Sequence, residues 1–192
     1  GTVRPPGDKS ISHRALLVGA LARGTGTSEF TGLLTGDDVK STARVLRQLG
    51  AEISSIRDGA TVVVRASRFT PPASQLHCGN SGTTARLLLG VLAGQPFRAR
   101  LTGDASLRRR PMRRVTDPLR AMGADIEIEE EANDSLPLTI RGGRLRPLTY
   151  TTPVASAQIK SALLLAGLTG HVRVVLREPH LSRDHTERLF VH

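Results

Sequence analysis

The stretch GDKSISHRALLVGALA, residues 7–22, contains the pattern from which the fold can be predicted. A polar start leads into a run of leucine and small residues, which predicts a buried helix that packs closely against its neighbours. Lys9, Ser10 and the free N–H groups of the first helical turn can together bind an anion. Arg14 lies one turn beyond Ser10 on the same face. By itself the stretch is equally compatible with a capped surface helix.

The leucine-rich run occurs three times, starting at residues 16, 87 and 163. The starts lie 71 and then 76 residues apart, which indicates an internal repeat. Hydroxyl side chains stand near the three helix starts, at Ser10, Ser81 and Ser156. A glycine after each run predicts the end of the helix, at Gly24, Gly94 and Gly170. The sequence therefore predicts three similar units, each with a buried helix.

Each unit is also expected to carry a second helix and several strands. Amphipathic helices are predicted at residues 38–49 and 110–122, and both run into Gly-Ala. One strand is expected to end at Pro5-Pro6-Gly7. Further strand-like segments are residues 52–53, 61–64, 125–128, 136–140 and 171–176. This order predicts the unit β-α-β-α-β-β, and hence an α/β fold of the α+β type.

The third unit is shorter than the other two. It has the buried helix, the strand at residues 171–176 and a second helix that begins near Ser182, and the sequence stops at His192. A unit without its last two strands would leave an open sheet edge. We therefore expect one domain over residues 1–192, with units at about 1–70, 71–145 and 146–192, the last of them incomplete. A third unit that is naturally short is the alternative.

Two motifs in the second unit have the composition of ligand-binding loops. CGNSGTTAR, residues 78–86, is glycine-rich and can expose backbone N–H groups to a ligand. It lacks the Lys-Ser/Thr end of a nucleotide-binding loop, and a simple turn is the alternative. GDASLRRRPMRR, residues 103–114, has five arginines within seven positions. A solvated basic face is the ordinary interpretation, but its place at the start of an amphipathic helix favours a ligand role for one arginine.

Two further motifs lie in the third unit. ASAQIKSALLLAGL, residues 155–168, places the hydrogen-bonding side chains of Ser156 and Gln158 at the head of a buried helix. SRDHTE, residues 182–187, contains a serine, an aspartate and a histidine, as a hydrolytic triad does. Members of a triad meet in space and are not defined by adjacency in sequence. We therefore interpret Ser182 as a helix cap with Arg183 beside it.

The bulk composition limits the kinds of partner. The net charge of +10 favours anionic ligands, either nucleic acids or small polyanions. Aromatic residues make up 3% of the chain, which is few for a surface that stacks nucleic-acid bases. Cys78 is the single cysteine, and no Cys/His cluster has zinc-ligand spacing, so we expect no metal and a reducing, cytoplasmic location. No apolar run approaches the roughly 18 residues of a membrane span. We expect neither a nucleic-acid nor a membrane partner.

Taken together, the motifs resemble the 5-enolpyruvylshikimate-3-phosphate (EPSP) synthase family. GDKSISHR, GDD, GNSGTT-AR, GDASL-RRP, ASAQIKSALLLAGL and SRDHTE occur in the family's order and cover nearly the whole chain. The wording of GDASL, ASAQ and SRDHTE resembles the bacterial branch that includes glyphosate-insensitive members. The resemblance implies a fold of two similar domains, each with three βαβαββ units, of the inside-out barrel type.

The resemblance also implies an activity. The family transfers the enolpyruvyl group of phosphoenolpyruvate to the 5-hydroxyl of shikimate 3-phosphate through a tetrahedral adduct. It releases phosphate and uses no cofactor. In this chain, Lys9 would contact both substrates and assist proton transfer. Shikimate 3-phosphate would be bound by Ser10, Arg14, Ser156, Ala157, Gln158 and Arg183. Phosphoenolpyruvate would be surrounded by Asn80, Gly82 and Arg110, with Arg86 in support and with Asp37 and Asp38 nearby in no assigned role.

Part of the family's machinery is missing from this sequence. In the family, the acid–base Asp and Glu and further cations for phosphoenolpyruvate lie in the second domain, none of whose motifs occurs here. We therefore expect the chain to be incomplete without that domain, supplied in cis or in trans. Insensitive relatives often carry Ala where Gly82 stands, so the resemblance implies that a full-length protein with Gly82 is inhibited by glyphosate.

Three alternatives stay open at this point. The UDP-N-acetylglucosamine enolpyruvyl transferases share the fold and the reaction type but lack the GDKS-S-HR wording, and Cys78 does not match their reactive cysteine. A nucleic-acid-binding module that uses residues 108–114 is a second alternative. A truncated, inactive domain with a structural role is the third.

Overall fold

The structure is a computed structural model that describes residues 1–3, 5–22, 26–129 and 135–192. Its helices are α1 (Lys9–Leu21), α2 (Asp37–Gln48), α3 (Gly82–Ala93), α4 (Arg113–Met122), α5 (Ala157–Gly170) and α6 (His185–Val191), with a 3-10 turn at Leu107–Arg109. Its strands are β1 (Thr27–Phe30), β2 (Glu52–Ile53), β3 (Val62–Arg65), β4 (Leu76–His77), β5 (Arg98–Thr102), β6 (Asp125–Ile128), β7 (Leu138–Arg141), β8 (Leu148–Thr151) and β9 (Val174–Arg177).

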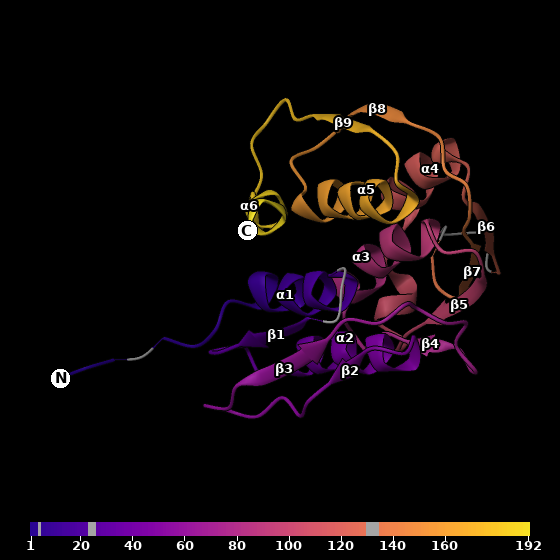
Figure 1. The fold of residues 1–192 in the computed structure, drawn as a ribbon. Coiled ribbons are helices and arrows are strands. Elements are labelled where there is room, and N and C mark those ends of the chain that lie inside the picture. The colour runs from indigo at the N-terminus through magenta and orange to yellow at the C-terminus, as the bar shows by residue number, and fades with distance from the viewer. Residues whose placement is uncertain (4, 23–25, 130–134) are drawn as a thin grey trace.

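The strands form three separate sheets that lie outside the helices (Figure 1). The first sheet is antiparallel, in the order β1-β3-β2. The second has the order β4-β5-β7-β6, in which β4 and β5 are parallel and the other pairs are antiparallel. The third is the parallel pair β8-β9. The second unit thus has the complete predicted order, β4-α3-β5-α4-β6-β7, and the first unit has the order α1-β1-α2-β2-β3, without the first strand. The α/β fold class is confirmed.

The three leucine-rich helices form the centre of the molecule. Leu16, Leu88 and Leu163 are fully buried, one in each of α1, α3 and α5. Small residues between the leucines let two of these helices approach closely. A Cβ atom on Gly90 of α3 would overlap the carbonyl oxygen of Ala162 in α5 and would lie 2.7 Å from its carbonyl carbon. Only glycine fits this crossing, because the obstacle is backbone that cannot rotate away.

The amphipathic helices end as the Gly-Ala pairs predict. Gly50 follows α2 with φ +100°, and Gly123 follows α4 with φ +106°, a conformation that favours glycine. The N–H of the next alanine then donates back into the helix, from Ala51 to the Leu46 carbonyl (3.0 Å) and from Ala124 to the Leu119 carbonyl (3.1 Å). This is the hydrogen bonding of a Schellman cap, and it turns the chain directly into β2 and β6.

Several predicted boundaries are wrong. The described residues 1–3 and 5–8 form no strand, so the strand expected to end at Pro5-Pro6-Gly7 is absent there. Proline has no N–H with which to join a ladder. Gly170 lies inside α5, and His171 takes the left-handed conformation instead, with φ +53°. The predicted stop at Gly24 falls outside the described residues.

Two helix starts also differ from the prediction. Ser182 does not cap α6, because its hydroxyl donates to Glu178 (2.5 Å) and the helix begins at His185. The helix predicted at residues 110–122 begins at Arg113, because Leu107–Arg109 form the 3-10 turn and Arg110 is extended. Both differences arise from side-chain and turn geometry that hydrophobic periodicity does not register.

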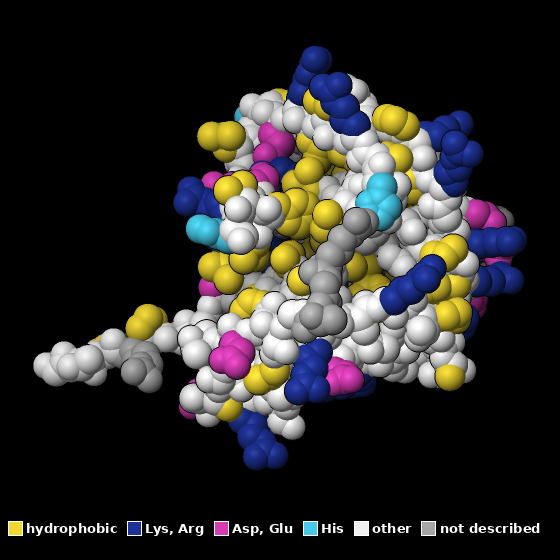
Figure 2. Space-filling view, viewed as in Figure 1, with side chains coloured by type: hydrophobic (Ala, Val, Ile, Leu, Met, Phe, Trp, Pro, Cys, Tyr) yellow, Lys and Arg dark blue, Asp and Glu magenta, His cyan; other side chains and the backbone are white. Residues whose placement is uncertain are grey.

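One face of the molecule is hollowed and apolar (Figure 2). The hollow has a volume of about 680 Å³ and lies beside α1, β1, the end of α5 and α6. Its apolar lining includes Val18, Leu21, Phe30, Leu168, Leu189 and Phe190. No helix among the described residues combines the length and the apolarity that crossing a membrane requires.

Candidate active site

The starts of α1, α3 and α5 lie at one edge of the molecule. Each is capped by a side chain that accepts from a backbone N–H of the first turn: Asp8 for α1, Ser81 for α3 and Ser156 for α5. Side chains then join the starts. Arg14 of α1 donates to the Ala157 carbonyl (3.3 Å), and Gln158 of α5 donates to the Thr83 hydroxyl (2.9 Å). Three positive helix ends therefore face one region, which favours an anion there.

Lys9 stands at the start of α1 with its ammonium group accessible. Its Nζ lies 3.1 Å from Oδ2 of Asp38, which belongs to the first turn of α2 together with Asp37. The Lys9 side chain is 55% exposed, and ion pairs of that kind contribute under about 1 kcal/mol. A bound anion can therefore compete with Asp38 for Lys9 at little cost.

A first group of polar side chains connects α1, α5 and the segment before α6. Arg183 donates from Nη1 to the Ser10 hydroxyl (3.0 Å) and is otherwise exposed. Arg14, by contrast, is only 3% exposed. Burial lowers the pKa of its guanidinium, and the charge of Arg183 adds to that effect.

The hydrogen bonds of Arg14 are almost all made within the protein. Its Nε donates to Thr186 (2.7 Å), Nη1 donates to the Ser10 carbonyl (2.9 Å), and Nη2 donates to Ser161 (2.7 Å) and to Ala157. A guanidinium has five N–H donors, so one of them is left for a ligand. In this structure Arg14 holds the site together, and its ligand role stays a prediction.

A second group lies around the start of α3. Arg110 donates to the amide oxygen of Asn80, and the amide nitrogen of Asn80 donates to Asp104 (2.7 Å). Arg86 donates to Gln158 (2.9 Å) and to the Pro111 carbonyl (3.0 Å). Burial lowers the pKa of Arg86, and the neighbouring positive charges of Arg110 and Arg114 lower it further. Such a cluster of like charges is stabilised when an anion binds among them.

Gly82, the first residue of α3, faces this cluster of arginines. A Cβ atom at Gly82 would lie 2.8 Å from Nη1 of Arg86 and 3.5 Å from Nη1 of Arg110. A methyl group here would displace the flexible end of Arg86 rather than backbone. It would therefore alter the space around the two guanidinium groups without disturbing the fold.

The site residues predicted from the sequence thus fall into connected groups. Ser10, Arg14, Ala157 and Arg183 are joined by hydrogen bonds, and so are Asn80 and Arg110. Gln158 lies between the groups, bonded to Arg86 and Thr83. Ser156 caps its own helix, and Lys9 pairs with Asp38. Their roles toward substrates stay predictions.

Sequence reasoning missed a buried chain of hydrogen bonds beneath the site. Nδ1 of His13 lies 2.7 Å from the Thr42 hydroxyl, which lies 2.7 Å from the Thr84 hydroxyl. Thr84 in turn donates to Ser81, the cap of α3 (2.7 Å). The chain joins α1, α2 and α3, and its members are far apart in sequence. The sequence motif around His13 does not indicate which residues its side chain contacts.

His13 makes the fold sensitive to acid. Its side chain is fully buried, and burial lowers its pKa from 6.5 to about 4, despite the opposing charge of Asp38. The folded state therefore keeps His13 neutral, whereas the unfolded chain binds a proton below pH 6.5. The contribution of neutral His13 to the free energy of unfolding is fully present above pH 6.5 and is lost as the pH falls toward 4. The loss is about 3 kcal/mol at most.

The comparison of wild type with His13→Gln measures this effect. Glutamine is a polar side chain of similar size that does not titrate. We expect urea unfolding to show a steeper loss of stability between pH 6.5 and 4 for the wild type than for the variant. Carboxylates that titrate in the same range contribute to both proteins and cancel in the difference. Parallel curves for the two proteins would contradict the assignment to His13.

Cys78 has no nucleophilic role in this arrangement. It is fully buried before the glycine-rich loop, and burial raises the pKa of its thiol to about 12. A thiol in that state is unreactive at neutral pH. Among the described residues, no group of three or more His, Cys, Asp or Glu side chains is arranged to hold a metal ion.

Comparison with known proteins decides the family. The model of the family described as EPSP synthase (3-phosphoshikimate 1-carboxyvinyltransferase) matches residues 1–192. The chain belongs to this family. The resemblance inferred from the six motifs is thereby confirmed.

Individual relatives agree with the family match. A 3-phosphoshikimate 1-carboxyvinyltransferase of Geobacillus kaustophilus is 56% identical over 192 residues, and one of Thermosynechococcus vestitus is 54% identical. Each alignment covers 98% of this chain but only 44% and 43% of the relatives. The structure of EPSP synthase from Acinetobacter baumannii superposes with a TM-score of 0.90 at 43% identity, over 98% of this chain and 42% of that one. The chain therefore spans less than half the length of the relatives it matches.

Proposed function

We propose that this chain provides one half of the active site of a 3-phosphoshikimate 1-carboxyvinyltransferase. The complete enzyme would transfer the enolpyruvyl group of phosphoenolpyruvate to shikimate 3-phosphate and release phosphate. One observation carries the proposal. The capped starts of α1, α3 and α5 lie at one edge of the molecule, beside four cationic side chains: Lys9, Arg86, Arg110 and Arg183. Two phosphorylated carboxylates require that combination of cations and helix N–H groups.

The two groups of polar side chains divide naturally between the two substrates. Ser10, Arg14 and Arg183, with Ser156, Ala157 and Gln158 at the start of α5, would hold shikimate 3-phosphate. Asn80, Gly82 and Arg110 would surround phosphoenolpyruvate, with Arg86 in support. Lys9, whose ion pair with Asp38 is exposed, would reach both substrates and assist proton transfer. Fixing both substrates in one geometry removes much of the entropic part of the barrier.

A second domain, in cis or in trans, is part of the proposal. The coverage of only 44% of a 56% identical relative supports it. The apolar hollow beside α5 and α6 supports a continuation of the third unit, because in the second unit β7 contacts the buried helix α3. Strands that continue the third unit would cover the hollow in the same way. We also propose one N-terminal-type domain over residues 1–192 and a cytoplasmic location, which the single, buried Cys78 supports.

Binding of shikimate 3-phosphate to the 192-residue chain tests the proposal. We expect weak binding, with a Kd on the order of 1 mM, because the second half of the pocket is missing. Arg183→Ala should weaken it at least about fivefold, since charge-assisted hydrogen bonds contribute 1 kcal/mol or more. Isothermal titration calorimetry measures both values.

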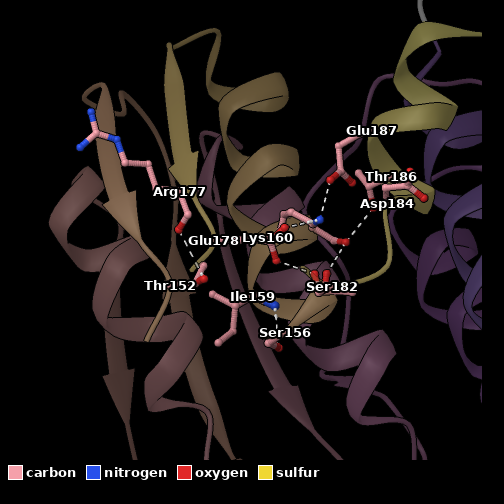
Figure 3. A network of polar contacts seen from close by, with 12 residues as sticks. Thr152, Ser156, Ile159, Lys160, Arg177, Glu178, Ser182, Asp184, Thr186 and Glu187 are labelled. Carbon is pink, nitrogen blue, oxygen red and sulfur yellow. Dashed lines mark hydrogen bonds and ion pairs between the residues drawn. The ribbon is translucent and has the colours of Figure 1, made fainter. Parts of the chain in front are cut away.

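Arg177→Ala is the matched control. It removes the same charge from β9, where the side chain points away from the polar network (Figure 3). Its Kd should stay within about twofold of the wild type, as expected for an exposed residue outside the site. Equal affinities of wild type and Arg183→Ala would contradict the assignment of Arg183 to the substrate.

A further inference from the structure

Lys160 is a buried charge for which the proposed function has no use. It lies in the first turns of α5, and its side chain is 6% exposed. Its Nζ lies 2.6 Å from Oε2 of Glu178 and 2.6 Å from Oε1 of Glu187. Burial tends to lower the pKa of Lys160, but hydrogen bonds to the two glutamates outweigh it and raise the pKa overall. The ammonium group is therefore charged, and it holds two carboxylates at once.

The two glutamates stand at either end of one segment. Glu178 directly follows β9, and Glu187 lies in the first turn of α6. Residues 178–184 between the strand and the helix belong to neither a helix nor a strand. Ser182 within the segment donates to the second oxygen of Glu178 (2.5 Å). Figure 3 shows Glu178, Ser182 and Glu187 gathered around the Lys160 ammonium group.

Arg183 is carried by this same segment. Its guanidinium extends to Ser10 of α1, and its side chain makes no other hydrogen bond among the described residues. Two residues of α5 contact the ends of this segment. Lys160 holds both ends of the segment, and its neighbour Ser161 bonds Thr186 (2.7 Å) next to Glu187.

We propose that Lys160 is a positioning residue, which holds Glu178 and Glu187 so that the segment between them keeps Arg183 over Ser10. The inference rests on the proposed function only in taking the ligand at that place to be shikimate 3-phosphate. Replacing a whole buried ion pair often changes stability little, but removing one partner destabilises the fold, because the other charge is left uncompensated. Without the ammonium group, Glu178 and Glu187 are left facing each other, and the segment must move to separate them.

A double-mutant cycle with the 192-residue chain separates positioning from general stability. Lys160→Met keeps the length and apolar stem of the side chain but removes its charge. We expect it to raise the Kd for shikimate 3-phosphate about fivefold and by no more than Arg183→Ala does, because Lys160 would act through Arg183. In an Arg183→Ala background the same change should raise the Kd less than about twofold, because the residue through which Lys160 acts is gone. Equal effects in both backgrounds would overturn the proposal.

Two further variants keep the cycle interpretable. Lys160→Arg retains a cation between the glutamates and is expected to restore most of the binding. If Lys160→Met does not fold, Glu187→Gln is measured instead, since it breaks one ion pair of a carboxylate that is 39% exposed. Failure of Lys160→Arg to bind better than Lys160→Met would count against a charge-based role.

A measurement without ligand distinguishes failure of this inference from failure of the proposed function. Hydrogen exchange followed by mass spectrometry reports the segment at residues 178–187 and, as an internal control, α3. Lys160→Met should accelerate exchange at residues 178–187 and leave α3 unchanged. If shikimate 3-phosphate does not bind even the wild type, the proposed function fails while this result still tests Lys160. Unchanged exchange at residues 178–187 would overturn the inference whatever the ligand.

Discussion

Incubated with shikimate 3-phosphate and phosphoenolpyruvate, the purified 192-residue chain is expected to release no phosphate above background. It carries Lys9 and the proposed anion-binding groups, but it spans only 44% of a 56% identical relative. The resemblance to the family places the acid–base carboxylates and further cations in the other half. Loss of general acid–base catalysis alone typically lowers a rate about 10²–10⁴-fold, and loss of substrate orientation lowers it much further. A colorimetric phosphate assay measures the rate.

Addition of the missing half provides the positive control. The remaining residues of the Geobacillus kaustophilus relative, co-expressed as a separate chain, are expected to restore phosphate release. Lys9→Met in this chain should then abolish the restored activity, which shows that the signal depends on residues 1–192. Phosphate release by the 192-residue chain alone, at the rate of a complete synthase, would refute the proposal that a second domain is required.

Gly90→Ala is expected to destabilise the fold strongly, because the added methyl group would meet the backbone of a neighbouring helix. The new Cβ would lie 2.7 Å from the carbonyl carbon and 2.8 Å from the Cα of Ala162. Because these atoms belong to the backbone of α5, the helices α3 and α5 must separate. Overpacking of a core costs about 1–3 kcal/mol, and we expect the upper end of that range for this substitution. The total stability of a domain is only about 5–15 kcal/mol.

Urea unfolding followed by circular dichroism measures the loss for Gly90→Ala. Gly26→Ala is the matched control, because a Cβ at Gly26 would meet no atom of the described residues within 4 Å. That variant should stay within about 0.5 kcal/mol of the wild type. The separation of α3 and α5 should also weaken the contacts of Gln158 with Arg86 and Thr83, so shikimate 3-phosphate affinity should fall with stability. A Gly90→Ala midpoint equal to that of Gly26→Ala would contradict the close helix crossing.

Local sequence signals were sufficient for most of the fold. The three leucine-rich runs predicted α1, α3 and α5, and the Gly-Ala pairs predicted where α2 and α4 end. These signals work because burial and a left-handed turn each restrict the residue at a single position. The strand expected at Pro5-Pro6-Gly7 failed because proline has no N–H with which to join a ladder.

The site could be predicted less completely, because its geometry depends on partners that are distant in sequence. Motif wording pointed to Ser10, Arg86 and Arg183, and the structure shows what each contacts. It gave no reason to single out Lys160, whose charge is buried only because Glu178 and Glu187 come from later elements. Ser182 was misinterpreted for the same reason, since its partner is a carboxylate and not a helix N–H.

The confinement of each sheet to its own stretch of sequence has a consequence for how the chain folds. The three sheets lie within residues 27–65, 76–141 and 148–177. Each sheet can therefore form its hydrogen bonds as soon as its own stretch has left the ribosome. The longest loops are closed by the contacts of α1 with α6 and the segment before it, from Arg14 to Thr186, 172 positions away, and from Ser10 to Arg183, 173 positions away. We therefore expect the edge that carries the anion-binding groups to form in the final step of folding, after all three sheets.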